Sequence, residues 1–116
     1  MRDVDMTVNE VYEITRSALD EHGKKDWGVG FHATKKNIGL CQYDRKRIMF
    51  SSYWLSLLNT QDWHNIIKHE VAHALMGPGY GHSKAWRDKA HEIGLNVAEE
   101  KWGCGELQTL RDLLNE

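Results

Sequence analysis

The sequence lacks a paired-cysteine motif, a long apolar run and any repeated or low-complexity segment. Its 116 residues include two cysteines, Cys41 and Cys104, which form no CxxC pair, so no zinc ribbon is expected. No apolar stretch approaches the roughly 18 residues of a membrane span, and the acidic, polar residues 1–5 are unlike a signal peptide. We therefore expect a cytoplasmic protein with two free thiols. A Cys41–Cys104 disulfide is the alternative, which a reducing compartment disfavours.

Residues 24–47 carry a local excess of positive charge in a chain whose formal net charge is −2. Two acids, Asp26 and Asp44, stand there among seven cations: Lys24, Lys25, Lys35, Lys36, Arg45, Lys46 and Arg47. The net charge argues against a general affinity for polyanions, and no aromatic residues interleave with the cations as in nucleic-acid-binding motifs. Ordinary solvated turns are the simpler interpretation. A rim that contacts DNA phosphates is the alternative.

The segment His69-Glu70-Val71-Ala72-His73 has the HExxH pattern of zinc metallopeptidases. On a helix, residues four apart lie on one face, so His69 and His73 can bind the same metal ion. Glu70 lies roughly 60° around the helix from the second histidine, where it can contact a metal-bound water without being a ligand. This geometry predicts two ligands and a general base.

The residues around this motif favour a helix from Asp62 to Met76. Its apolar residues recur at helical spacing and form a stripe nearly opposite the two histidines: Trp63, Ile67, Val71, Ala74 and Leu75. Asp62 suits an N-cap or a first-turn acid, and Gly77-Pro78-Gly79 ends the helix abruptly. The helix can therefore bury one side in a core and present the histidines to a cleft.

A catalytic zinc site has three protein ligands and an open position, so a third ligand must follow. Gly79 occupies the position at which the extended metzincin pattern requires histidine, which excludes that class. If a helix runs from about Ser83 to Ile93, its buried face holds Ala85, Trp86, Ala90 and Ile93, and His82 points along that face. His91 projects to the opposite side. His82 is the preferred ligand, and Glu92, on the flank, is the alternative.

These motifs resemble the SprT-like metallopeptidase domain, to which the Spartan proteases also belong. The resemblance rests on residues 69–75, on the Gly81-His82 step and on the aromatic residue Trp86. Upstream, residues 38–41 and 48–51, on either side of a polar turn, resemble the paired strands before the family's catalytic helix. The resemblance implies that His82 is the third ligand. It also raises the prospect of DNA as a partner, since Spartan-type members cleave proteins crosslinked to DNA.

The sequence departs from this family in two places. At Ser83-Lys84-Ala85 the family more often has a Gly-Pro-Glu-like segment, a difference that bears on substrate contacts and leaves the metal ligands intact. The second departure is the missing zinc ribbon.

The order of the expected elements predicts an α+β fold of the zincin-like type. A capping box at Thr7–Glu10 begins an amphipathic helix that ends near Gly23. Three strands are expected at 27–33, 37–43 and 47–52, in a small antiparallel sheet, followed by the HExxH helix and a second ligand-bearing helix. We expect residues 1–116 to form one domain, with a core at about 8–95 and a helical extension at 96–116.

The resulting hypothesis is a zinc-dependent peptidase. His69, His73 and His82 would hold Zn²⁺, and Glu70 would take a proton from the zinc-bound water that attacks the peptide carbonyl. The substrate would be a loose or extended polypeptide, including proteins associated with DNA, and the oligomeric state is left open. The alternative is a zinc-bound, proteolytically weak binding module that acts on nucleoprotein; it does not explain Glu70, which a structural zinc site does not need.

Overall fold

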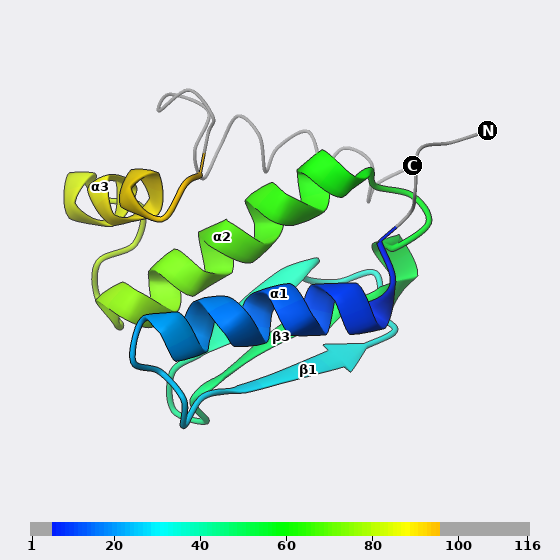
Figure 1. Cartoon of the computed structure of the whole chain (residues 1–116), viewed down its shortest axis with the longest axis horizontal. Helices are drawn as coiled ribbons and strands as arrows, with labels where there is room; N and C mark the ends of the chain where they lie inside the picture. Colours follow the sequence, from blue (N-terminus) through cyan, green and yellow to red (C-terminus); the bar gives the residue numbers. More distant parts are fainter. Residues whose placement is uncertain (1–5, 96–116) are drawn as a thin grey trace.

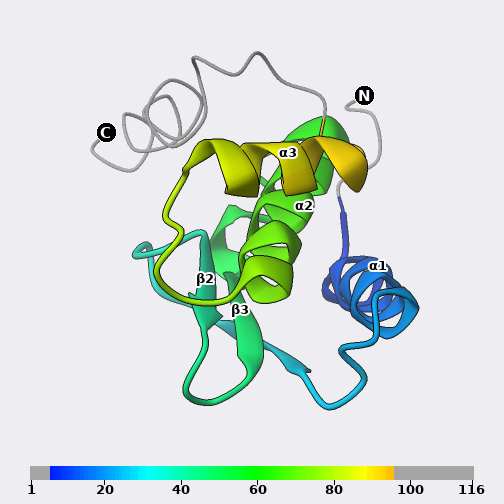
Figure 2. The ribbon, with the colours of Figure 1, turned by 90° about the vertical axis from the view of Figure 1, so that its left-hand side faces the viewer.

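The computed structural model describes residues 6–95. The expected extension at 96–116, with Cys104, lies outside the described residues. The described chain folds in the order α1 (Val8–Glu21), β1 (Gly28–His32), β2 (Gly39–Gln42), β3 (Arg47–Ser51), the 3₁₀ helix η1 (Ser52–Trp54), α2 (Thr60–Met76) and α3 (Lys84–Glu92). The predicted α+β fold is confirmed. Both α1 and α2 cover one face of the sheet, and α3 packs on α2 (Figures 1 and 2). Among the described helices, none has the length and hydrophobicity that crossing a bilayer requires.

Helix α1 begins at the predicted capping box. The Thr7 hydroxyl accepts from the Glu10 backbone N–H, and the Glu10 carboxylate accepts from the Thr7 backbone N–H, both at 3.1 Å. This reciprocal pair satisfies backbone donors that the first turn leaves unpaired. Buried Val11, Thr15 and Leu19 form the face that packs on the core.

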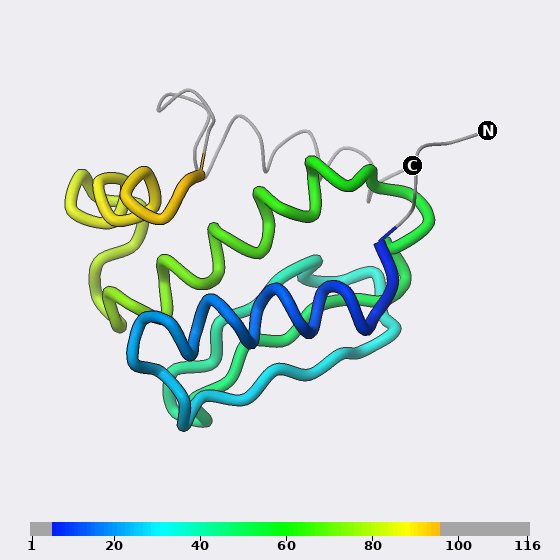
Figure 3. The backbone as a smooth tube through the Cα atoms, in the orientation of Figure 1, coloured from blue at the N-terminus to red at the C-terminus, as the bar shows by residue number. Residues whose placement is uncertain are grey.

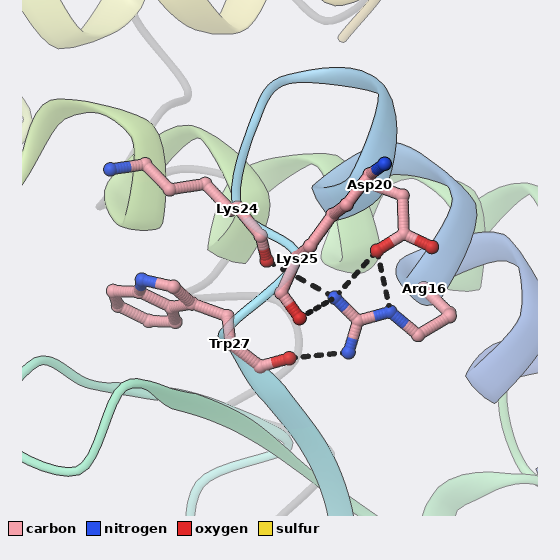
Figure 4. A network of polar contacts seen from close by, with 5 residues as sticks. All are labelled: Arg16, Asp20, Lys24, Lys25 and Trp27. Carbon is pink, nitrogen blue, oxygen red and sulfur yellow. Dashed lines mark hydrogen bonds and ion pairs between the residues drawn. The ribbon is translucent and has the colours of Figure 1, made fainter.

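Arg16 links the end of α1 to the start of β1 by hydrogen bonds and an ion pair (Figure 4). Its guanidinium pairs with Asp20 at 2.9 Å and donates to the backbone carbonyls of Lys24 at 3.1 Å and of Trp27. Trp27 is buried and packs edge-on against Tyr43. The α1–β1 connection is thereby fixed by one side chain that satisfies several carbonyls.

The sheet is mixed, which corrects the all-antiparallel expectation. The predicted hairpin of β2 and β3 is antiparallel, with Cys41 opposite Ile48, but β1 pairs with β3 and runs parallel to it. The physical reason is burial: β3 carries Ile48 and Phe50, both fully buried, and therefore takes the central position. A six-residue loop then carries the chain past β3 from β1 to β2, which leaves β2 at the edge beside α2.

Helix α2 begins at Thr60, two residues before the expected start at Asp62. Asn59 is the N-cap, and Asp62 is the first-turn acid that completes a second capping box. The helix ends at Gly77, whose φ of 86° belongs to the left-handed region that favours glycine. The chain then turns away from the end of α2 and continues as α3, which lies across α2 (Figures 2 and 3).

Two clusters of buried side chains lie on different sides of α2. The larger one joins α2 to the sheet and α1, and its largest fully buried members are Trp63, Phe50, Leu19, Ile48, Leu58 and Ile67. The smaller one joins α2 to α3 through Ala72, Trp86, Ala90 and Leu95. The predicted stripe is part of the larger cluster, but α2 is buried on more than that one side. Of the four residues expected on the buried face of α3, Trp86 and Ala90 are buried, Ile93 at the C-cap packs against both clusters, and Ala85 is exposed.

Candidate metal centre

Three histidine side chains converge at the C-terminal half of α2. His69 and His73 lie one turn apart on α2, and His82 reaches them from the loop that precedes α3. The Nε2 atoms are separated by 3.3 Å for His69 and His73, 3.2 Å for His73 and His82, and 3.1 Å for His69 and His82. The structure therefore brings together the three residues that the sequence predicts as ligands.

Hydrogen bonding alone cannot satisfy this arrangement of nitrogens. Each Nε2 of a neutral imidazole is either a donor or an acceptor. In a triangle of three such atoms, at least two neighbours must be of the same kind, so two lone pairs or two N–H groups face each other. A cation in the middle would accept all three lone pairs at once. The triangle therefore has the form of a donor set that could hold a metal ion.

The dimensions of the triangle fit zinc. Zn–N bonds of about 2.0–2.1 Å in a tetrahedral site place neighbouring nitrogens about 3.3–3.4 Å apart. The observed Nε2 separations of 3.1–3.3 Å lie close to that edge length. Three imidazoles would also leave one position of a bound zinc for water or substrate, as in catalytic zinc sites.

The environment keeps two of these imidazoles neutral, the form that binds a metal. Burial lowers the pKa of His69 to about 3, and the neighbouring His73 and His82 add to the effect. Burial, with the charge of His82, lowers the pKa of His73 to about 4. Both side chains therefore keep a free lone pair at neutral pH.

Glu70 follows the first of these histidines on α2 and faces the edge strand β2. Its side chain is buried, and burial raises its pKa to about 8. A Cβ built on Gly39 would stand 2.8 Å from Glu70 Cγ and 3.0 Å from Oε2, so the carboxylate occupies space that only glycine leaves open at that position. Within residues 6–95, the only group of side chains close enough to share a metal ion is the three histidines, without Glu70.

The alternative ligand, Glu92, lies away from this group. It is exposed near the end of α3 and forms an ion pair with Lys89 at 3.1 Å. His91 is exposed as well. His82 reaches the triangle because Gly81, with a φ of 54°, turns the chain immediately before it.

A sequence profile of the SprT-like family matches residues 8–102. This match spans most of the chain. The chain belongs to the SprT-like family.

The fold is similar to that of a solved metallopeptidase. The crystal structure of the metallopeptidase zymogen of Methanocaldococcus jannaschii jannalysin superposes with a TM-score of 0.64 at 15% identity, covering 89% of this chain and 96% of that one. At that identity the likeness concerns the fold. A comparison with curated proteins finds no match.

The contact between Glu70 and the edge strand does not follow from the sequence alone. Gly39 and Cys41 alternate along β2 and so share one face, and Tyr43 continues this alternation directly after the strand. Burial and the charge of Glu70 raise the pKa of the Cys41 thiol to about 12, and the Cys41 and Tyr43 side chains share a hydrogen bond. Cys41 is a free thiol. Their alternate spacing follows from the sequence, but which residue of α2 they face depends on how α2 crosses the sheet.

The seven cations of residues 24–47 form two groups rather than one rim. Lys24, Lys25, Arg45, Lys46 and Arg47 lie where β1 and β3 begin, and Lys46 pairs with Asp26 at 3.1 Å. The second group, in the β1–β2 loop, is about 15 Å away along the five residues of β1. It consists of Lys35, which lies 5.4 Å from the centre of the Tyr53 ring, and Lys36.

Proposed function

We propose that this chain is a zinc-dependent metallopeptidase in which His69, His73 and His82 hold the metal and Glu70 is the general base. The observation that carries the proposal is the triangle of three Nε2 atoms, 3.1–3.3 Å apart, with a buried carboxylate one residue from the first ligand. Membership of the SprT-like family and the fold of a solved metallopeptidase support a function of this type.

The donor set suits hydrolysis at neutral pH. Zinc, when bound, would polarise the peptide carbonyl and acidify water at the open position. Glu70 would take the proton of the attacking water and return it to the leaving amine. A carboxylate must be ionised to accept a proton, and a divalent cation nearby favours that form against the burial that raises the pKa of Glu70 to about 8.

The expected substrate is a loose or extended polypeptide, including one associated with DNA. The edge position of β2, beside Glu70, leaves the backbone groups on one side of that strand unpaired by the other two strands. A folded substrate would have to unfold locally before a peptide bond could reach a carboxylate that is buried between α2 and β2.

The test compares Glu70→Gln with the parent and with Glu92→Gln, a matched change at an exposed carboxylate on α3. Glu70→Gln should keep zinc and the fold, because Gln is nearly isosteric and the residue is not a ligand. Cleavage of an unfolded protein should fall by about 100-fold or more, the usual size of general acid–base contributions. Glu92→Gln should cleave as the parent does.

Two results would count against the proposal. Equal rates for Glu70→Gln and the parent would assign the hydrolysis to a contaminant or to another base. A zinc-loaded parent that cleaves no protein substrate, even with DNA or a protein activator supplied, would instead favour a zinc-bound binding module that acts on nucleoprotein.

A further inference from the structure

Trp86 touches all three histidines of the metal centre. Its ring centre lies 4.8 Å from those of His69 and His73 and 4.7 Å from that of His82. The indole stacks on the His73 ring at 25° and meets the other two at 66° and 76°. The side chain is fully buried.

The centres of the four rings form a tetrahedron whose edges are nearly equal in length. The centres of the three imidazoles lie 4.9–5.0 Å from one another, and the indole centre stands at 4.7–4.8 Å from each, above the middle of their triangle. The indole therefore closes one side of the histidine triad. Any imidazole that swings toward that side meets the indole at van der Waals contact.

Of the three histidines, His82 depends most on such a contact for its position. His69 and His73 are held by α2, but His82 follows a loop in which Gly77, Gly79 and Gly81 all have positive φ. Glycine at such positions confers little stiffness on the backbone. Trp86 lies one helical turn beyond His82, and Ser83, the N-cap of α3, fixes the start of that turn by accepting from the Trp86 backbone N–H.

We propose that Trp86 is a positioning residue that holds the three imidazoles in metal-binding geometry and thereby sets the affinity of the site for zinc. This inference rests on the proposed function in so far as both assign zinc to the three histidines. Residues that orient metal ligands typically change metal affinity by about 10- to 100-fold when they are substituted. Trp86 acts through the ligands and need not touch substrate.

The experiment measures zinc affinity by competition with a chromophoric chelator, for the parent, Trp86→Leu and Trp86→Phe. The matched control is Trp63→Leu, because Trp63 is also a fully buried tryptophan but packs against Phe50, 6.0 Å between ring centres, in the larger core cluster. The Tm of each zinc-free protein reports the loss of packing. The visible spectrum of the Co²⁺-loaded proteins reports the geometry of the ligands.

We expect Trp86→Leu to weaken zinc binding by about 10- to 100-fold and to alter the Co²⁺ spectrum. Trp86→Phe, which keeps a ring against the imidazoles, should lose less and remains informative if the leucine variant does not fold. Trp63→Leu should lower the Tm and leave both metal readouts at the parent values.

Parent-like zinc affinity in both Trp86 variants would overturn this inference alone. Equal losses of affinity in Trp63→Leu and Trp86→Leu would also overturn it, because general destabilisation would then explain the effect. A parent protein that binds no zinc would overturn this inference and the proposed function together.

Discussion

Replacing Gly39 by alanine should disable the general base without removing the metal. The added Cβ would stand 2.8 Å from Glu70 Cγ, 3.2 Å from Cδ and 3.0 Å from Oε2. Carbon atoms in contact normally lie about 3.5–4.0 Å apart, so the Glu70 side chain would have to retreat by about 1 Å. Gly39 has no positive φ, so alanine can adopt the same backbone conformation without strain. The added Cβ instead crowds the side chain of Glu70.

A displacement of about 1 Å in a catalytic group can reduce the rate by about 100-fold, which corresponds to about 2.7 kcal/mol of activation free energy. We therefore expect kcat on an unfolded protein substrate to fall by about two orders of magnitude in Gly39→Ala. Zinc content should stay at the parent value, because the atoms nearest to the added Cβ all belong to Glu70, which is not a ligand. The assay is steady-state proteolysis with metal analysis of the same samples.

Gly30→Ala is the control for this change. Its Cβ would stand 2.7 Å from Met49 Sδ, an equally close approach, but to the flexible end of a side chain that can move. Its kcat should match that of the parent. In a Glu70→Gln background, Gly39→Ala should cause no further loss, because both changes act on the same carboxylate. A parent-like kcat in Gly39→Ala, or an equal loss in Gly30→Ala, would refute this reasoning.

Two further predictions concern stability and DNA. Burial raises the pKa of Glu70 to about 8 from an ordinary 4.5, so the zinc-free folded chain keeps a proton that the unfolded chain has lost. Between pH 6.5 and 8 the free energy of unfolding should therefore fall as pH rises, by up to about 1.4 kcal/mol per pH unit, and urea denaturation of Glu70→Gln should show no such fall. DNA binding should be weak and, with two or three phosphate contacts, should fall by about 10- to 40-fold between roughly 50 and 200 mM salt. Reversing the charges of Arg45 and Arg47 should weaken it more than reversing Lys35 and Lys36, because the first pair belongs to the larger cationic group; affinities unchanged by both reversals would remove the idea of a DNA surface.

Local features of the fold were predictable because neighbouring residues determine them. The capping box at Thr7 follows from side chains three residues apart. The helical face shared by His69 and His73 follows from the helical repeat, and the turn between β2 and β3 follows from a polar segment between two apolar ones. The choice of His82 over Glu92 could be argued from the expected faces of the next helix.

Features that depend on tertiary packing were not predictable in the same way. The parallel pairing of β1 with β3 arises because β3 is the most buried strand, which no single segment reveals. The approach of Gly39 to Glu70 depends on the angle at which α2 crosses the edge strand. The contact of Trp86 with three imidazoles depends on how closely α3 packs on α2.

Metal analysis of the purified protein and two variants tests the central claim most directly. The account predicts about one zinc per chain in the parent, because the three Nε2 atoms form a single tetrahedral donor set. It also predicts loss of that zinc in His82→Ala and retention in Glu92→Ala, whose side chain pairs with Lys89 on the surface. Full zinc occupancy in His82→Ala, with loss in Glu92→Ala, would contradict the three-histidine site and indicate a glutamate as the third ligand.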